Sequence, residues 1–303
     1  MAELQKITEF LSNTGARKLA LEILDHFGGM ARNIDHYAEL CESFYHVNEF
    51  DKSAAWAERA LSCADTPAKK DYLLSMLANA RHRSGMHEEA LAALDAMTES
   101  SCMAAVRGDC MDALEQQRHI SDTGFWGEAL AARHTHSSDL AEWISGFFDP
   151  MVRVNDLGCG NGFYLKKLAE RGFVDLVGYE GEPLRQAMFG DIRRQDISRT
   201  FAVDVRGSTI FLEVGEHIPK QFQDAVVDNV CRSCGDKLVM SWAMRDQLGV
   251  GHVNCLDPGE VILIFESRGM ELMESETREA RSRVRDGCGW FAHNLLVFRR
   301  RDQ

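Results

Sequence analysis

The glycine-rich segment 152–164, VRVNDLGCGNGFY, constrains the fold more than any other part of the chain. A short apolar run leads into Gly158, Gly160 and Gly162, and helix-forming residues follow at once. A strand, a glycine turn and a helix bring the backbone of an α/β sheet close to a nucleotide-like ligand. Asp156 lies just before the glycines, and its carboxylate would repel a pyrophosphate. The segment therefore predicts a site for a ligand that carries an ammonium or sulfonium group.

An acidic residue at the end of a second apolar run supports this interpretation. Residues 174–180 read VDLVGYE, and Glu180 lies 20 positions beyond Gly160. A carboxylate at the tip of the second strand of such a sheet can accept hydrogen bonds from both hydroxyls of a ribose. A solvated glutamate at a strand end is the alternative, but the spacing and the following Gly181 favour the ribose role.

The segment 152–164 resembles motif I of the class I S-adenosylmethionine (SAM)-dependent methyltransferases, which have a Rossmann-like fold. The resemblance runs from about Trp143 to Phe298, roughly half of the chain. It implies that SAM is the methyl donor, that S-adenosylhomocysteine is the product, and that Glu180 holds the ribose.

Two later segments extend the resemblance. Residues 195–198, QDIS, resemble the place where the family binds adenine, although a plain turn aspartate is the alternative at Asp196. Residues 209–219, TIFLEVGEHIP, match the family's hydrophobic strand followed by Glu-Val-x-Glu-His. The resemblance implies a cofactor site formed by Asp156, Gly158, Cys159, Gly160, Asn161, Gly162, Tyr164, Glu180, Gly181, Asp196, Ile197, Leu212 and Glu213.

The same resemblance places Glu216 and His217 at the mouth that faces the methyl acceptor. Methyl transfer is an in-line displacement, so much of the catalysis is placement of the acceptor. A base is needed only when the acceptor is a hydroxyl or a protonated amine. His217 and His252 are the candidate bases because histidine titrates near neutral pH, and a structural role in its loop is the alternative for each. Asn254 could orient a substrate oxygen.

His134 and His136 precede an expected helix at residues 140–147. In related enzymes the segment before the first strand often covers the cofactor, so His136 could contact the substrate. The two histidines could also bind a metal together with His217. Surface positions on an N-terminal cap are the favoured interpretation, and we expect no metal site.

Strand and helix signals alternate along the rest of this region. The order predicts a doubly wound, seven-stranded, mostly parallel α/β sheet, with the ligand at the carboxyl ends of the strands. The expected elements are a helix at 220–233 ended by Gly235, a strand at 237–242, a helix from Asp257-Pro258 to Gly269, and strands at 270–277 and 290–299.

The charge and the cysteines narrow the class of protein. A net charge of −13 argues against broad nucleic-acid binding. Arg281, Arg283 and Arg285 alternate as on a strand face, and the interleaved glutamates favour a solvated, salt-bridged edge there. The N-terminal sequence lacks the apolar core of a signal peptide, no run approaches a membrane span, and the nine cysteines are scattered. We expect a reduced, cytoplasmic protein, without zinc at the lone Cys231-x-x-Cys234 pair.

Residues 1–115 carry almost no strand signal. Two segments that each open an amphipathic helix, 48–54 and 84–90, echo each other 36 residues apart. This spacing resembles that of tetratricopeptide repeats. We therefore expect an all-α helical-repeat domain at 1–115, a helical connector or cap at 116–150 and the SAM-binding domain at 151–303. The helical-repeat domain could bind a protein, a peptide or the acceptor, could mediate self-association, or could only pack as a cap.

The sequence predicts a SAM-dependent methyltransferase that acts on an oxygen or nitrogen acceptor. A small metabolite or a sugar hydroxyl is preferred, because the sequence shows no dedicated macromolecule-binding segment. Two alternatives remain: an enzyme whose protein or peptide acceptor is held by the helical repeats, and a SAM-binding scaffold without catalysis.

Overall fold

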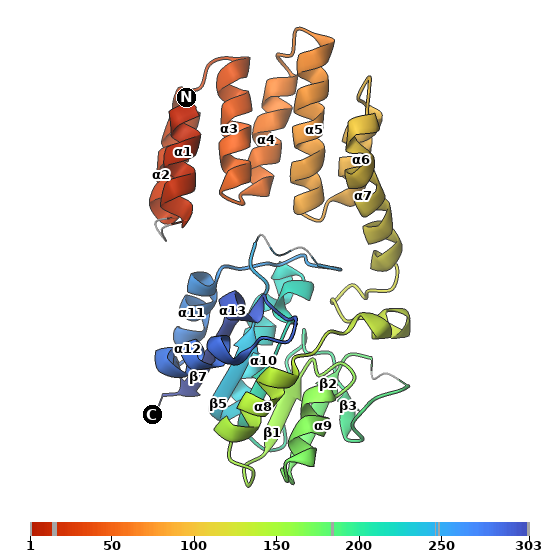
Figure 1. Cartoon of the computed structure of the whole chain (residues 1–303), viewed down its shortest axis with the longest axis vertical. Coiled ribbons are helices and arrows are strands. Elements are labelled where there is room, and N and C mark those ends of the chain that lie inside the picture. Colours follow the sequence, from red (N-terminus) through yellow and green to blue (C-terminus); the bar gives the residue numbers. More distant parts are fainter. Residues whose placement is uncertain (1, 14–16, 183–184, 246, 248, 302–303) are drawn as a thin grey trace. The chain divides into compact units, whose positions relative to one another are not determined.

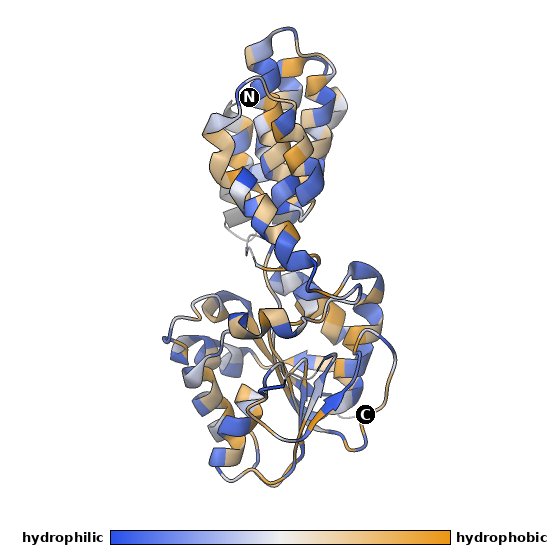
Figure 2. Cartoon of the chain, turned by 90° about the vertical axis from the view of Figure 1, so that its right-hand side faces the viewer, coloured by the Kyte–Doolittle hydropathy of each residue, from blue (hydrophilic) through white to orange (hydrophobic). Residues whose placement is uncertain are grey.

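The computed structural model of the chain describes residues 2–13, 17–182, 185–245, 247 and 249–301. The chain divides into two compact units, Met1–Glu115 and Gln116–Gln303. Figure 1 labels the elements of each unit, and Figure 2 shows hydrophobic and hydrophilic residues interspersed along the helices of both, as amphipathic helices require.

The first unit is made of helices that pack side by side in the order of the sequence (Figure 1). Thr66 caps the fifth helix by accepting a hydrogen bond from the Lys69 N–H. Asn48 and Gly85 take left-handed backbone, with φ of 59° and 76°, in the turns before α4 and α6, where the two echoing segments lie. The helices are α1 Ala2–Asn13, α2 Arg17–Met30, α3 Ile34–His46, α4 Phe50–Leu61, α5 Pro67–Arg83, α6 His87–Asp95, the 3₁₀ turn Ser101–Met103 and α7 Ala104–Gln117.

The second unit is built on a seven-stranded sheet with the order β3-β2-β1-β4-β5-β7-β6. Only β7 runs antiparallel, to both β5 and β6, and the remaining neighbours are parallel. This mixed α/β sheet is the one that the sequence predicts. The strands are β1 Val154–Leu157, β2 Leu176–Glu180, β3 Ile192–Arg194, β4 Gly207–Phe211, β5 Cys234–Ser241, β6 Met270–Leu272 and β7 Leu295–Arg300.

Helices cover both faces of this sheet, because successive strand residues point to opposite sides. Leu238 and Met240 share one apolar core with Val226 of α10, whereas Val239 shares the other with Leu165 of α9. The helices are α8 Ser138–Phe147, α9 Phe163–Glu170, α10 Gln223–Ser233, α11 Pro258–Glu266, α12 Glu274–Arg283 and α13 Phe291–Asn294, with 3₁₀ turns Glu128–Arg133, Gly215–His217 and Lys220–Phe222. The result is a doubly wound sheet with its core on each side.

Two predicted helix starts are confirmed in this unit. Ser137 accepts a hydrogen bond from the Leu140 N–H and caps α8. Asp257 and Glu260 form a capping box at the start of α11, with Pro258 in the first turn.

The prediction of a strand at 270–277 is wrong beyond Leu272. Helix α12 follows, and its charges pair at helical spacing, as in the ion pair of Arg278 with Glu274. Arg281 and Arg283 therefore lie on a helix, so their apparent alternation does not mark a strand face. The segment is polar and its charges pair at i,i+4 spacing, and this favours a helix over a strand here.

Two boundaries also differ from the prediction. Gly235 does not end α10, which stops at Ser233, but lies inside β5. Residues 291–294 form the short helix α13 before β7 begins. None of the described helices is both long enough and apolar enough to cross a membrane.

Candidate functional site

A cavity of about 350 Å³ opens at the carboxyl ends of β1, β2 and β4. This is the edge at which an open α/β sheet binds ligands. Most of the residues that the resemblance implies line it: Asp156, Gly158, Cys159, Gly160, Tyr164, Glu180, Gly181, Asp196, Ile197, Leu212, Glu213, His217, His252 and His136.

The glycine turn after β1 has backbone that only glycine tolerates easily. Gly158 has φ of 75°, and a Cβ there would stand 2.5 Å from a methyl of Val214. Gly160 has φ of 53°, and a Cβ there would meet the ring of His134 at 2.8 Å. The turn is therefore pressed against two other loops of the site, which explains the glycines at alternate positions.

Asn161 and Gly162 do not line the cavity but hold the turn in place. The Asn161 side chain accepts a hydrogen bond from the Phe163 N–H at 3.1 Å and contacts Nε2 of His136 at 3.0 Å. Gly162 is the N-cap of α9 with φ of 79°. Both were predicted to contact the cofactor, and the structure places them in the turn rather than among the residues that line the cavity.

Two carboxylates meet beside this turn. Asp156 is 2% exposed, and its Oδ2 has no hydrogen-bond partner among the described residues. Burial raises the pKa of Asp156 to about 8, and the charge of Glu180 adds to this shift. Glu180 accepts hydrogen bonds from the N–H groups of Gly160 at 2.8 Å and Gly181 at 2.7 Å, while burial raises its pKa. A positive charge in the cavity would therefore be stabilised next to Asp156.

A third carboxylate, Glu213, is held by three donors. Ser241 Oγ and Asn294 Nδ2 donate to its Oε1 at 2.8 and 2.9 Å, and Gln247 Nε2 donates to its Oε2 at 2.9 Å. Glu213 has φ of 53°, a left-handed conformation that is rare for a residue other than glycine. The strained backbone and the fixed side chain indicate that its placement matters for what the cavity binds.

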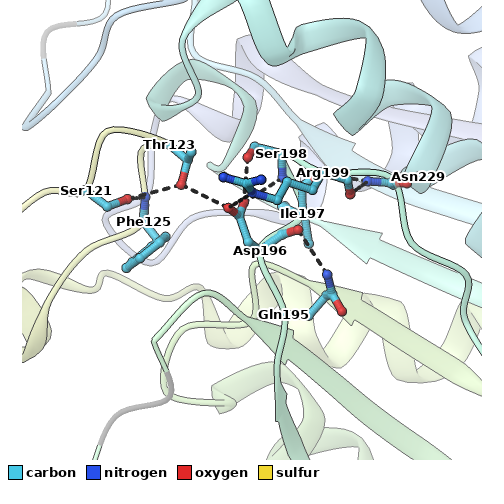
Figure 3. Close-up of polar contacts among 9 residues, drawn as sticks. All are labelled: Ser121, Thr123, Phe125, Gln195, Asp196, Ile197, Ser198, Arg199 and Asn229. Carbon is cyan, nitrogen blue, oxygen red and sulfur yellow. Dashed lines mark hydrogen bonds and ion pairs between the residues drawn. The ribbon is translucent and has the colours of Figure 1, made fainter.

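Asp196 is the centre of a hydrogen-bonded loop at the rim, drawn in Figure 3. Its Oδ1 accepts from the N–H of Ser198 at 2.9 Å and from the Ser198 hydroxyl at 2.6 Å. Its Oδ2 faces Thr123 Oγ1 at 3.3 Å and Arg199 Nε at 3.4 Å. Asn229 of α10 donates to two backbone carbonyls of this loop. The loop is thus rigid, and Thr123 ties it to a segment more than seventy positions earlier.

The segment 120–126 covers part of the cavity, as the sequence suggests for residues before the first strand. An isolated bridge joins Ile120 to Trp126. A Cβ at Gly181 would stand 2.5 Å from the ring of Phe125, so the two segments touch. The Trp126 ring centre lies 5.1 Å from that of His217. Thr123, Phe125 and Trp126 line the cavity. None of the three was predicted from the sequence. Two aromatic residues between Gly124 and Gly127 are a signal for a close-packed loop that could have identified them.

His217 and His252 also line the cavity, and Glu216 lies next to them outside the lining; we call these three residues the cavity cluster. One potential ligand atom from each lies within 4.8 Å of the other two. Glu216 is fully buried, and neither of its carboxylate oxygens has a hydrogen-bond partner in the described part of the chain. Nδ1 of His217 is buried and lacks a partner in the same way.

Burial shifts the pKa values of this cluster toward neutral forms. It lowers the pKa of His217 to about 3, with a smaller effect from His252, and it lowers the pKa of His252. It raises the pKa of Glu216 well above its ordinary range, and Glu213 adds to that shift. The near-neutral titration that makes histidine a good base is therefore absent at His217.

Asn254 and Glu216 lie behind the cavity wall. Asn254 donates to Gln223 Oε1 at 3.1 Å, and its carbonyl accepts from Nε1 of Trp242 at 2.6 Å. The backbone carbonyl of Glu216 accepts hydrogen bonds from the N–H groups of Val253 and Asn254. Asn254, predicted to orient a substrate oxygen, is therefore placed where it holds the loop that carries His252.

The charged residues that line the cavity are mostly acidic. Among the described lining residues there is one arginine, Arg133. The acidic lining residues are Asp156, Glu180, Glu182, Asp196 and Glu213. Such a field favours a ligand with positive charge and hydroxyl donors, and it opposes a pyrophosphate.

No protein-family model and no curated protein matches the chain. Among solved structures, magnesium protoporphyrin IX methyltransferase from Synechocystis PCC 6803 with bound SAM is 18% identical over 54% of this chain and 76% of that one, with a TM-score of 0.38. A SAM-dependent methyltransferase from Corynebacterium glutamicum is 18% identical over 63% and 97% of the two chains, with a TM-score of 0.40.

A third similar structure is 1,6-didemethyltoxoflavin-N1-methyltransferase from Burkholderia thailandensis, solved with S-adenosylhomocysteine. It is 12% identical over 66% of this chain and 89% of that one, with a TM-score of 0.42. These similarities are low. The cavity's own residues, described above, therefore carry the functional proposal.

Proposed function

We propose that this protein is a SAM-dependent methyltransferase that methylates an oxygen or nitrogen acceptor. The observation that carries the proposal is the buried Asp156 carboxylate, which has an oxygen without a partner and faces the cavity beside Glu180. A buried carboxylate of this kind is costly unless a cation or a donor meets it. The ammonium and sulfonium groups of SAM would supply that charge.

Each carboxylate of the cavity fits one part of such a ligand. Glu180 is oriented by two backbone N–H groups and keeps lone pairs for ribose hydroxyls. The loop around Asp196 and Ile197 is fixed by Thr123 and Asn229 and would border the adenine. Leu212 and Glu213 also line the cavity. When bound, SAM supplies an activated methyl on sulfur, and the chain's task is to orient it and exclude water.

Binding of S-adenosylhomocysteine tests this proposal first. At 100 times its Kd, the ligand should add about 2.7 kcal/mol to the stability of the protein. The Asp156→Asn variant should lose most of this gain, whereas Glu170→Gln, at an exposed position of α9, should keep it. No thermal shift at millimolar ligand with the native protein would exclude a SAM site.

We propose two alternative means of activating the acceptor. One is a histidine that acts as a base, and the other is a divalent cation bound by the cavity cluster. The cation proposal rests on the three ligand atoms that lie within 4.8 Å and on the unpartnered oxygens of Glu216. Glu216, His217 and His252 would hold the ion, and a bound ion would make an acceptor hydroxyl more acidic. The residues present fit such an ion, because a carboxylate and two neutral imidazoles are common ligands.

A chelator separates the two means of activation. Activity that is lost in chelator and restored by one added divalent metal supports the ion. Activity that survives chelator but is lost in His217→Asn supports the histidine as base. Affinity for S-adenosylhomocysteine, measured in the same samples, should not change, since the cluster includes neither Asp156 nor Glu180.

A small metabolite or a sugar hydroxyl is the preferred class of methyl acceptor. The helical unit, which we propose to be tetratricopeptide-like, could instead hold a protein or peptide acceptor. Residues 116–303 alone would then lose transfer to that acceptor while still binding S-adenosylhomocysteine. Transfer of labelled methyl to any component of a source-cell extract would exclude a non-catalytic scaffold, and mass spectrometry of the product would identify the acceptor.

A further inference from the structure

A second group of metal-ligating side chains lies in the helical unit and shares no residue with the cavity. His82 belongs to the last turn of α5, His87 is the first residue of α6, and Cys110 lies in α7. We call these three residues the thiol cluster. One potential ligand atom from each lies within 4.8 Å of the other two. The short turn between α5 and α6 and the packing of α7 thus bring two imidazoles and one thiol to a single point.

The spacing of these atoms is that of ligands around one tetrahedral ion. Nδ1 of His82 lies 3.3 Å from Nδ1 of His87 and 3.4 Å from Sγ of Cys110. At ordinary Zn–N and Zn–S bond lengths, two nitrogens on a tetrahedral zinc stand about 3.3 Å apart, and a nitrogen and a sulfur stand about 3.5 Å apart. Both observed distances match these edges.

Hydrogen bonds alone satisfy this arrangement poorly. A ring nitrogen of histidine offers either one proton or one lone pair. Nδ1 of His82 therefore cannot form full hydrogen bonds to both His87 and Cys110, although it contacts both. A central ion removes this conflict, since it takes one lone pair from each of the three atoms.

The surroundings suit ligands that bind a metal. Cys110 is fully buried and is the buried residue of α7, while His82 and His87 are partly buried. Burial lowers the pKa of both histidines, so their nitrogens carry lone pairs at neutral pH. The charge of Asp109 acts on both His82 and Cys110 and would help to balance a cation.

We propose that His82, His87 and Cys110 bind one Zn²⁺ through two imidazole nitrogens and one thiolate, with a solvent molecule as the fourth ligand. The Cys110 thiol releases its proton to solvent as the Zn–S bond forms. Imidazole and thiolate together select zinc over magnesium or calcium. The ion has a structural role, because it links the α5–α6 turn to the buried side chain of α7.

Titration of the full-length, metal-stripped and reduced protein with Co²⁺ tests this site. Cobalt in a tetrahedral site with a thiolate ligand gives visible d–d bands and a near-ultraviolet charge-transfer band. We expect the charge-transfer band to saturate at one ion per thiol cluster and to disappear when Zn²⁺ is added. Absence of the band in the native protein would overturn the proposal.

Substitutions assign the band to its cysteine. Cys110→Ser should abolish it, and His87→Gln should weaken Co²⁺ binding by at least about 100-fold, since even outer contacts of metal ligands are worth 10–100-fold. Two matched controls should keep it: Cys102→Ser, at an exposed cysteine of the same unit, and Cys255→Ser, whose Sγ lies 3.8 Å from Nδ1 of His252. A band that survives Cys110→Ser, or one that is lost in Cys255→Ser, contradicts the assignment.

Helix content by circular dichroism accompanies each variant. If Cys110→Ser does not fold, His87→Gln decides the question, because His87 lies partly exposed at the start of α6. A folded His87→Gln protein that binds Co²⁺ with native affinity would overturn the three-ligand site.

Discussion

Burial acts in opposite directions on two groups of the site, the carboxylate end formed by Asp156 and Glu180 and the histidine end formed by His217 and His252. At the carboxylate end, burial raises the pKa values of Asp156 and Glu180; at the cavity cluster, it lowers those of His217 and His252. Both ends are therefore pushed toward neutral side chains in the free protein. At both, a bound cation would favour the ligating form of the side chains: a sulfonium or ammonium at one end and a metal ion at the other.

The ends differ in where their residues come from. Asp156 and Glu180 lie at the tips of neighbouring parallel strands, β1 and β2. The cavity cluster lies in loops, and the hydrogen bonds of Val253 and Asn254 to the Glu216 carbonyl bring its histidines together. The carboxylate end is thus fixed by the sheet, whereas the cavity cluster depends on loop packing. Variants at each end should therefore separate binding from turnover.

The largest expected effect is on cofactor affinity. Glu180→Ala removes the acceptor for two hydroxyls, and each hydrogen bond to a charged group is worth about 1.5–3 kcal/mol. Affinity for S-adenosylhomocysteine, measured by calorimetry, should fall at least about 100-fold. Glu170→Ala, at an exposed glutamate of α9, is the matched control. A loss below tenfold in Glu180→Ala would contradict the ribose role.

At the other end, Glu216→Gln should lower turnover while leaving affinity for S-adenosylhomocysteine unchanged. Loss of one metal ligand should lower the metal affinity of the cavity cluster at least about 100-fold, because loss of even an outer contact of a metal ligand costs up to about 100-fold. Initial rates with and without added divalent metal measure this effect. Glu271→Gln, in the exposed ion pair with Arg299, is the control. Reduced cofactor affinity in Glu216→Gln would show that the two ends do not act separately.

The glycine turn after β1 is expected to tolerate no side chain at Gly158. Gly158→Ala should destabilise the protein by about 2–4 kcal/mol, because the left-handed conformation and the contact with Val214 both cost free energy. Urea unfolding measures this difference. Gly190→Ala places a Cβ in open space, and its stability should stay within about 0.5 kcal/mol of the native value. Equal stability of the Gly158→Ala and Gly190→Ala variants would refute the claim that the turn cannot accept a side chain at Gly158.

The smallest expected signal is proton release on ligand binding, up to one proton per site. The pKa of Asp156 is raised in the free protein, so its contribution to stability is full below its ordinary pKa and is lost as pH rises through about 8. A cationic ligand lowers this pKa and should release protons between about pH 4 and 8. Calorimetry in buffers of different ionisation enthalpy counts them.

Asp156→Asn provides the control for this prediction. Its unfolding midpoint should depend less on pH in that window than that of the native protein, and ligand binding should release fewer protons. Proton uptake by the native protein would reverse the sign and refute the role of Asp156.

The carboxylate end of the cavity could be predicted because its signals are local. The glycine spacing, Asp156 before the turn and Glu180 at the next strand end can all be read within about thirty residues of sequence. The seven-stranded sheet was also predicted, from the alternation of strand and helix signals along the chain. The error at 270–277 arose because a short strand and a polar helix adjoin there, and charge pairs decide in favour of α12.

The remaining features required contacts between distant segments. Thr123 meets Asp196, Phe125 packs on Gly181, and Trp126 lies against His217, although nothing near these residues marks such partners. The pKa of His217 changed its chemical interpretation, because histidine alone suggests a base of near-neutral pKa, whereas burial lowers its affinity for a proton. His82, His87 and Cys110 formed no recognisable metal motif in the sequence.

The sheet, the glycine turn and the carboxylates Asp156 and Glu180 could be recognised from local sequence, since backbone conformation and strand ends are set by residues close together in the chain. The loops that cover the cavity, the histidines with lowered pKa and the thiol that lies beside two imidazoles became visible in the folded chain. Burial and the distance between separate helices and loops set those properties, and both arise from packing of the whole unit rather than from any local pattern.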